Sequence, residues 1–200
     1  MIPWFSDSSH KRPDTSMNAD SWGRQFQVRA AYADDLNDVA QIITESFHSP
    51  SAFWGWTLPL LRLGIYEDLR HRLASPAPHQ LCLVAVDMAN TSNPKAGTVE
   101  LGVRYNDTWG HPSKSFVYLS NLAVHPHYRR QGVGSSLLAN CEKLARSWGF
   151  QDIYLHVLET NHTARQLYFK LGYRVHKVET GWNLFFFKRA PQILLHKRLS

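Results

Sequence analysis

The sequence has few cysteines, no long apolar run and no concentrated block of either charge. Its two cysteines, Cys82 and Cys141, are too few for a disulfide framework or for a zinc site of four thiolates. So low a cysteine content also fits a reducing compartment. The densest apolar stretch, at residues 184–187, is far too short to span a membrane. The sequence therefore argues against a disulfide scaffold and a membrane-spanning protein.

The N-terminal region also lacks a charged start followed by an apolar run and a small-residue cleavage site. We therefore expect no secretory signal. Residues 1–22 are polar, with Ser, Asp and Pro intermixed, and we interpret them as a flexible tail ahead of one folded domain at 23–200. An organelle-targeting peptide is the alternative interpretation of this tail. The expected location is the cytoplasm, with the plastid stroma as the alternative.

The charge is moderately positive and spread along the chain. The 22 Lys and Arg residues outnumber the 16 Asp and Glu residues, which gives a net charge of +6. Such a balance suits an anionic partner without choosing among a nucleotide cofactor, a nucleic acid and a membrane surface. Because the basic residues occur in short pairs and no nucleic-acid-binding module is present, we expect neither a nucleic-acid nor a membrane partner.

The apolar pattern is typical of a single α/β domain. Hydrophobic residues make up 44% of the 200 residues, enough for a core that needs no staple. Alternating or buried-looking apolar runs between polar loops predict strands at 26–30, 80–86, 96–104, 115–124, 153–158, 173–178 and 193–199. Helical spacing predicts helices from Asp34 or Asp35 to Phe47 and at 134–148 and 161–171. A further helix is expected at 60–73, ended by Ser75-Pro76. This order predicts a mixed sheet, with an antiparallel meander near its start and helices on its faces.

One segment of the sequence carries recognisable chemistry. At residues 122–137 a strand ends, a basic turn containing Gly132 and Gly134 follows, and a helix begins. A helix N-terminus offers unpaired N–H groups and a partial positive charge, and glycines let an oxyanion approach them. The pattern therefore predicts a phosphate or pyrophosphate site. It is neither a Walker loop, which closes with Gly-Lys-Ser/Thr, nor the dinucleotide fingerprint, whose third glycine is replaced here by Leu137.

Two motifs together resemble the GCN5-related N-acetyltransferase (GNAT) family, in its cyanobacterial and plastid branch. The family's signature Arg/Gln-x-x-Gly-x-Gly/Ala reads here Arg129-Arg130-Gln131-Gly132-Val133-Gly134. Residues 161–173 are similar to the family segment Asn-x-x-Ala-x-x-Leu-Tyr-x-x-x-Gly-Phe/Tyr. The resemblance covers residues 26–199. It implies the GNAT acyl-CoA fold, with a mostly antiparallel sheet of about seven strands and four helices, and acetyl-CoA as cosubstrate with no metal.

The resemblance also implies which residues bind coenzyme A. The turn would hold the pyrophosphate through backbone N–H groups, and the strand before it would pair with the pantetheine arm. Asn161 would contact that arm from the opposite side, and Tyr168 would lie near the thioester sulfur. The implied cofactor-binding residues are Leu122, Ala123, Val124, Arg129, Arg130, Gln131, Gly132, Val133, Gly134, Ser135, Asn161 and Tyr168.

The implied chemistry is direct attack of an amine on a thioester. Within the matched segment we favour Tyr168 as the general acid for the leaving thiolate, although its place on a helix stripe also suits a core aromatic. His156 occupies the place where some protein N-terminal acetyltransferases of this family carry a Glu base. It is the candidate base, directly or through a water, and a half-buried His packed on the sheet is an equal alternative. Further candidates for lining the site are Glu100, Tyr118 and Asn121.

Two other constellations favour structural roles. His125 and His127 alternate and suggest a metal pair, but no third ligand stands at a suitable spacing, so we expect no metal site. Cys141 lies on the apolar stripe of its expected helix with no His at helical spacing, so we expect it in the core rather than as an acyl-carrying nucleophile.

The acceptor amine leaves several hypotheses open. The expected walls of its pocket are the aromatic-rich stretches 48–59 and 179–192. Our first hypothesis is acetylation of protein N-terminal α-amines, with lysine ε-amines as further acceptors. The alternatives are a small arylalkylamine of the serotonin kind and a non-catalytic acyl-CoA sensor. We expect a monomer or a homodimer.

Overall fold

The computed structural model describes residues 26–47, 58–74, 78–90, 92, 94–106, 114–179 and 191–199. The expected tail at 1–22 lies outside the described residues. Most of the two expected acceptor walls, at 48–57 and 180–190, does so too.

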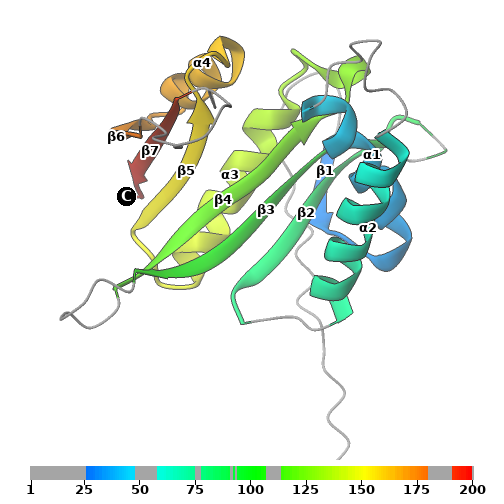
Figure 1. Cartoon of the computed structure of the whole chain (residues 1–200), viewed down its shortest axis with the longest axis horizontal. Helices are drawn as coiled ribbons and strands as arrows, with labels where there is room; N and C mark the ends of the chain where they lie inside the picture. The colour runs from blue at the N-terminus through cyan, green and yellow to red at the C-terminus, as the bar shows by residue number, and fades with distance from the viewer. Residues whose placement is uncertain are drawn as a thin grey trace, which may run out of the picture.

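Seven strands form one sheet in the order β1-β2-β3-β4-β5-β7-β6 (Figure 1). The strands are β1 (Phe26–Ala30), β2 (Gln80–Asp87), β3 (Lys95–Asn106), β4 (Lys114–Val124), β5 (Asp152–Leu158), β6 (Arg174–Glu179) and β7 (Gln192–Arg198). Strands β2 to β4 form the expected antiparallel meander, and β1 pairs antiparallel with β2. Strand β7 pairs antiparallel with both β5 and β6. Of these neighbouring pairs, only β4 and β5 run parallel. A parallel pair needs a crossover connection, and α3 supplies it.

Helices cover both faces of the sheet (Figure 1). They are α1 (Leu36–Phe47), α2 (Leu58–Ala74), α3 (Val133–Ser147) and α4 (His162–Lys170), with 3-10 turns at Ala33–Asp35 and Pro126–Tyr128. The expected helix start at Asp34 or Asp35 lies in the first of these 3-10 turns, and α1 itself begins at Leu36. Asp35 is the last residue of that turn, and its carboxylate accepts from the N–H of Tyr32 at 2.8 Å. None of the described helices is long and apolar enough to cross a membrane.

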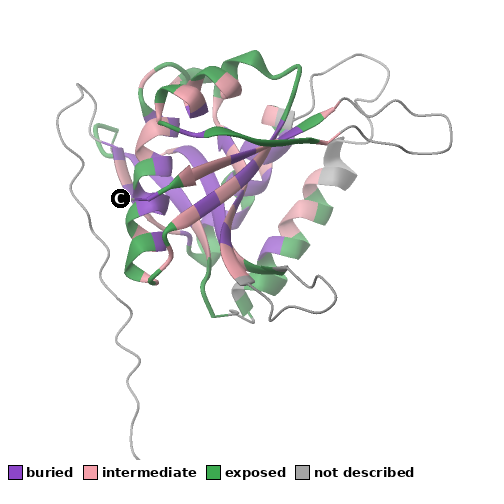
Figure 2. Ribbon diagram, turned by 90° about the vertical axis from the view of Figure 1, so that its left-hand side faces the viewer, coloured by how far each residue is buried: buried purple, intermediate pink, exposed green. Residues whose placement is uncertain are grey.

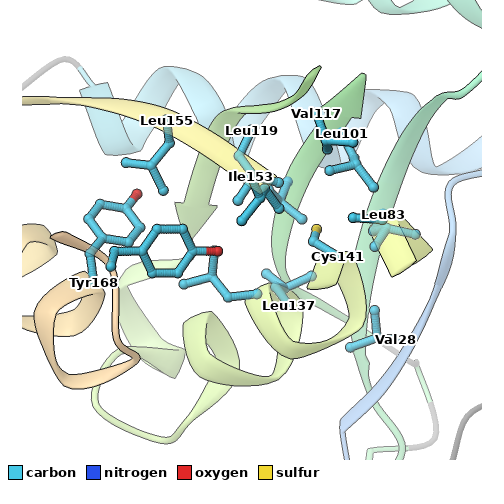
Figure 3. Packing of buried hydrophobic residues seen from close by; sticks show 14 of the residues in the cluster. Val28, Leu83, Leu101, Val117, Leu119, Leu137, Cys141, Ile153, Leu155 and Tyr168 are labelled. Atoms are coloured by element: carbon cyan, nitrogen blue, oxygen red, sulfur yellow. The ribbon is translucent and has the colours of Figure 1, made fainter. Parts of the chain in front are cut away.

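Strands β2 to β4 are buried between two apolar layers, as the burial colours show (Figure 2), whereas β6 is largely exposed. On one face, α1 packs Leu36, Val39 and Ile43 against Val84 and Val86 of β2. On the other face, α3 and α4 cover the strands with a larger cluster (Figure 3). The alternation predicted for β5 is confirmed, because Ile153, Leu155 and Val157 are buried and the residues between them are partly exposed. The predicted core position of Cys141 is confirmed too, since its side chain is fully buried.

A β-bulge interrupts β4 shortly before its end. The register with β3 shifts between the pair Glu100–Ser120 and the pair Thr98–Ala123, and Asn121 adopts a left-handed φ of +52°. An extra residue in one strand changes which side chains face which layer. Leu119 therefore lies in the core beneath α3, whereas Ala123 packs in the layer with α1.

The architecture confirms the fold class expected from the sequence. The predicted order of strands and helices is the observed one, and the sheet is mixed and mostly antiparallel, with seven strands and four α-helices. Gly149 and Gly172 both adopt positive φ values just after α3 and α4, a common way for a helix to end.

Two glycines of β3 test how tightly β3 and β4 pack behind the bulge. A Cβ at Gly97 would lie 2.8 Å from the carbonyl oxygen of Ala123, whereas one at Gly102 would meet nothing closer than 3.8 Å. We expect Gly97→Ala to lower the free energy of unfolding by about 1–3 kcal/mol, the usual cost of overpacking. Urea unfolding of Gly102→Ala is the control, and we expect it to be unchanged or up to about 1 kcal/mol more stable. Equal stabilities of the two variants would contradict the close packing at Gly97.

Candidate active site

Strands β4 and β5 diverge, and this divergence creates the candidate site. They pair only at Val117–Leu119 with Ile153–Leu155, although both strands continue beyond those positions. Figure 1 shows them separating towards their carboxyl ends. We call the separated ends, residues 120–124 of β4 and 156–158 of β5, the fork. The carboxyl ends of parallel strands where neighbouring connections part are a common place for ligands in α/β sheets.

The backbone of β4 presents hydrogen-bonding groups to the fork. The N–H of His125 donates to the carbonyl of Ala96 at 3.0 Å, so it points towards β3. Because successive N–H groups of a strand alternate in direction, the N–H of Val124 points the other way, into the fork. By the same alternation Leu122 faces the fork, whereas Ala123 pairs with Thr98 of β3. Leu122 and Val124 can therefore hydrogen-bond an extended ligand as a neighbouring strand would.

The turn after β4 presents further N–H groups at the same end of the sheet. Arg130 and Gly132 adopt left-handed φ values of +63° and +86°. Gly132 is the N-cap of α3 and offers no side-chain cap, and the first helical bond runs from the N–H of Ser136 to the carbonyl of Gly132. The N–H groups of Val133, Gly134 and Ser135 thus have no acceptor within the helix. Uncapped donors at a positive helix end beside two arginines form a cradle for an anion.

Side chains of the turn itself hold its shape. The guanidinium of Arg129 donates through Nε to the carbonyl of Val124 at 3.2 Å, and the amide of Gln131 donates to the carbonyl of His127 at 2.7 Å. Arg129 is therefore tied to the end of β4. Arg130 is exposed and adds positive charge beside the cradle.

Helix α4 closes the other side of the fork. A Cβ at Gly134 would lie 3.0 Å from Cδ2 of Leu167, so glycine lets the first turn of α3 approach α4. Asn161 caps α4, because its Oδ1 accepts from the N–H of Ala164 at 3.1 Å. This cap uses the oxygen of the side chain, so the two N–H donors of the same amide remain for a ligand.

Tyr168 reaches the cluster below the fork from α4. Its side chain is 7% exposed and lies beside Leu155 (Figure 3). Its ring meets that of Tyr173 edge to face, with centroids 5.8 Å apart. Burial raises the pKa of Tyr168, and the nearby Tyr118 raises it further. Tyr168 therefore keeps its proton at neutral pH and has it available to donate.

His156 lies on the opposite face of β5 from Tyr168 and is joined to two other side chains. Its Nδ1 is 2.7 Å from the hydroxyl of Tyr118 on β4, and its Nε2 is 3.3 Å from a carboxylate oxygen of Glu179 at the end of β6. Burial raises the pKa of Tyr118, whereas Arg104, 3.6 Å above its ring, acts to lower it. Both ring nitrogens of His156 therefore have partners within the protein.

Glu100 holds the bulge that begins the fork. This carboxyl group is 6% exposed, and its two oxygens accept from Arg72 of α2 at 2.6 Å and from the amide of Asn121 at 2.9 Å. The left-handed conformation of Asn121 is thus fixed by its own side chain. From the sequence, Glu100 and Asn121 were expected only to line the site, and no local signal shows their pairing or the part of Arg72.

The structure brings the predicted cofactor-binding residues together at one end of the sheet. Leu122 to Val124, the turn from Arg129 to Ser135 and Asn161 all lie around the fork, with Tyr168 below it and His156 across β5. Within the described residues, no group of three or more His, Cys, Asp or Glu side chains is placed to hold a metal ion. The rings of His125 and His127 lie 5.1 Å apart, and Nδ1 of His125 accepts from the N–H of His127.

A family model and several proteins are similar to this chain. Residues 36–173 match the model described as the Acetyltransferase (GNAT) family. The chain is 28% identical to "GCN5-related N-acetyltransferase 10, chloroplastic" of Arabidopsis thaliana, over 84% of this chain and 69% of that protein. It spans only between 23% and 58% of three further chloroplastic relatives from the same plant.

The names of two other relatives state which amine they acetylate. "Thialysine N-epsilon-acetyltransferase" of Bos taurus is 31% identical over 61% of this chain and 72% of that protein. The putative ribosomal protein bS18-alanine N-acetyltransferase of Bacillus subtilis is 26% identical over 72% of this chain and 78% of that protein.

The fold also occurs among solved structures. NAA60 of Arabidopsis thaliana, in complex with a bisubstrate analogue, matches with a TM-score of 0.65 and 19% identity, over 88% of this chain and 99% of that one. The PaiA N-acetyltransferase of Thermoplasma acidophilum, in complex with coenzyme A, matches with a TM-score of 0.60 and 18% identity, over 86% and 98%.

A comparison of substitutions at two glycines, one at each end of α3, distinguishes an effect on ligand binding from an effect of backbone strain alone. Gly132 and Gly149 have φ values of +86° and +84°, and neither would place a Cβ within 4 Å of another group. We expect Gly132→Ala and Gly149→Ala to lose about 1–2 kcal/mol of stability each, the cost of a left-handed residue. Calorimetric titration with acetyl-CoA should show weaker binding only for Gly132→Ala, about tenfold or more, because strain there moves the donors of the cradle. Equal affinities of the two variants would place the anion elsewhere.

Proposed function

This chain belongs to the GNAT acetyltransferase family, and from that premise we propose that it transfers the acetyl group of acetyl-CoA to protein N-terminal α-amines. Lysine ε-amines are proposed as further acceptors. The general reaction class, acetyl-CoA-dependent N-acetyl transfer, follows from the family and from relatives named as N-acetyltransferases.

The observation that carries this proposal is the meeting of the fork with the anion cradle. In the fork, Leu122 and Val124 offer backbone groups to an extended arm, and the uncapped start of α3 offers N–H groups to a diphosphate at the end of that arm. Acetyl-CoA has this combination of parts, a thin amide-containing arm and a pyrophosphate. Asn161 supplies amide donors from the other side of the fork.

The proposed reaction uses groups on both faces of β5. The neutral amine attacks the thioester carbon, and the N–H of Val124 donates to the oxyanion that forms, a contact typically worth about 3 kcal/mol. As the C–S bond breaks, Tyr168 gives its proton to the departing thiolate. A free thiol has a pKa of about 8.5, below the ordinary tyrosine value of about 10. Tyr168 therefore still carries its proton when the thiolate departs, and the transfer runs against this pKa difference as the C–S bond breaks. The proton lost by the amine passes to Tyr118 as Tyr118 passes its own to His156.

The ordinary acidity of amines favours α-amines as acceptors. An α-amine has a pKa of about 8 and is partly neutral at pH 7, whereas a lysine amine near 10.4 needs more help from a base. The Bacillus subtilis relative is named for an alanine acceptor on a ribosomal protein, which supports the α-amine proposal. The Bos taurus relative is named for an ε-amine of a lysine-like molecule, which supports the second activity.

Two alternatives remain distinguishable from this proposal. A small arylalkylamine would use the aromatic residues of 48–59 and 179–192, most of which lie outside the described residues. A non-catalytic acyl-CoA sensor would bind acetyl-CoA without turnover, and the presence of Tyr168 at the fork weighs against it. For location, the chloroplastic names of the Arabidopsis relatives favour the plastid stroma over the cytoplasm.

A peptide library tests the acceptor. We expect incubation with acetyl-CoA, followed by mass spectrometry, to show acetyl groups mainly on α-amines of peptides with varied N-termini. Acetylation of internal lysines alone would contradict the α-amine proposal within the same enzyme class. No acetylated peptide, with turnover of tryptamine or serotonin, would replace it by the arylalkylamine alternative.

A pair of tyrosines tests the acid. We expect Tyr168→Phe to lower kcat about 100-fold or more, because the thiolate then leaves without a proton, and to leave acetyl-CoA affinity within about twofold. Tyr173→Phe is the matched control, since it removes a hydroxyl from the neighbouring buried ring. We expect the control to keep its activity. Equal rates for both variants would exclude Tyr168 as the acid.

A further inference from the structure

The carboxylate beside His156 is that of Glu179 on β6, a strand that has no part in the reaction proposed above. Glu179 is the last residue of β6, two strands away from β5 in the sheet, since β7 lies between them. Its Oε2 lies 3.3 Å from Nε2 of His156. The other ring nitrogen, Nδ1, lies 2.7 Å from the hydroxyl of Tyr118. The three side chains form a continuous chain from β4 through β5 to β6.

The chemistry of these partners fixes where the protons are. An ionised carboxylate only accepts hydrogen bonds, so the Nε2 atom that contacts Glu179 must carry hydrogen. A neutral imidazole carries one hydrogen, which leaves Nδ1 as an acceptor. Tyr118 then donates its O–H to Nδ1. This is the one arrangement in which Tyr118 can give up its proton to His156 while its oxygen receives a proton from an amine.

We propose that Glu179 is a positioning residue for removal of the amine proton, because it holds His156 in the tautomer that accepts from Tyr118. The inference rests on the proposed function. In the step itself, an N–H bond of the amine breaks and an O–H bond forms at Tyr118. The original O–H bond of Tyr118 breaks, and an N–H bond forms at Nδ1 of His156. The positive charge that arises on the imidazole lies beside the carboxylate of Glu179.

The exposure of His156 and Glu179 and the charges around them determine how much the loss of Glu179 should lower kcat. Lys177 of β6 lies 3.4 Å from the other oxygen of Glu179, and Arg104 of β3 lies over the ring of Tyr118. The side chains of His156 and Glu179 are 27% and 41% exposed. Loss of the orienting carboxylate in a deeply buried triad costs roughly 10⁴ in kcat. Because water can partly replace Glu179, we expect a smaller loss here.

The structure also provides a matched His–carboxylate pair for the control. On the same face of the sheet, Nε2 of His196 lies 2.7 Å from Oδ1 of Asp152, and each of these side chains is 28% exposed. His196 stacks on Tyr154 with ring centroids 4.6 Å apart. This pair resembles the one at Glu179 in geometry and exposure but has no part in the proposed reaction.

The experiment measures the tautomer and the rate separately. Long-range ¹H–¹⁵N NMR of the imidazole rings, with the His156 signals assigned by their loss in His156→Gln, should show the Nε2–H form in the unmodified protein. In Glu179→Ala we expect a mixture of tautomers and a kcat lower by roughly 10- to 100-fold, with the KM for acetyl-CoA within about twofold. Glu179→Gln should recover part of the rate, because its carbonyl oxygen still accepts from Nε2–H.

The control and the contrary results separate this inference from the proposed function. We expect Asp152→Ala to leave both the His156 tautomer and kcat within about twofold of the unmodified protein. An Nδ1–H tautomer in the unmodified protein, or no change of tautomer and rate in Glu179→Ala, would overturn the role of Glu179. A protein that shows the expected tautomer and acetylates no amine would overturn the proposed function and the proton-removal role together, leaving only the contact itself.

Discussion

Strand β4 has two hydrogen-bonded neighbours in its first half and one in its second half. Its pairing with β5 stops after Leu119, and the bulge at Asn121 follows at once. From there the N–H groups that would have met β5 face the fork. The proposed donor site, oxyanion contact and acid all depend on this loss of pairing. Buried Glu100, held by Arg72 of α2, fixes the bulge that accompanies it.

The same geometry gathers the donors of the proposed reaction from the protein itself. Both α3 and α4 begin at the fork, so their positive ends face the place proposed for the negatively charged ligand. The uncapped N–H groups of α3 and the amide of Asn161 face the same place. Alternate residues of β5 face opposite sides of the sheet, so the proposed acid and the proposed base lie on different faces. Tyr168 lies with the core on one face and keeps its proton because burial raises its pKa. Tyr118 and His156 lie on the other face, where a nucleophile can approach.

Local sequence signals predicted much of this arrangement. The apolar periodicity of α1, α3 and α4 and the alternation of β5 are confirmed in the structure, because each corresponds to one packed face. The glycine-containing turn at 129–134 could also be predicted from the sequence, since strand, turn and helix are contiguous there. The network of Tyr118, His156 and Glu179 could not be predicted from the sequence, because its members belong to three different strands. Strand β7 comes last in the chain yet lies between β5 and β6, and no local pattern shows that insertion.

The most direct test of the central claim is amide hydrogen exchange with and without acetyl-CoA. If the donor lies in the fork as an additional strand, exchange at Leu122, Val124 and residues 133–135 should slow by about tenfold or more at saturating ligand. The paired positions Val117–Leu119 should change much less. Slower exchange elsewhere, with these fork and cradle amides unchanged, would contradict the account.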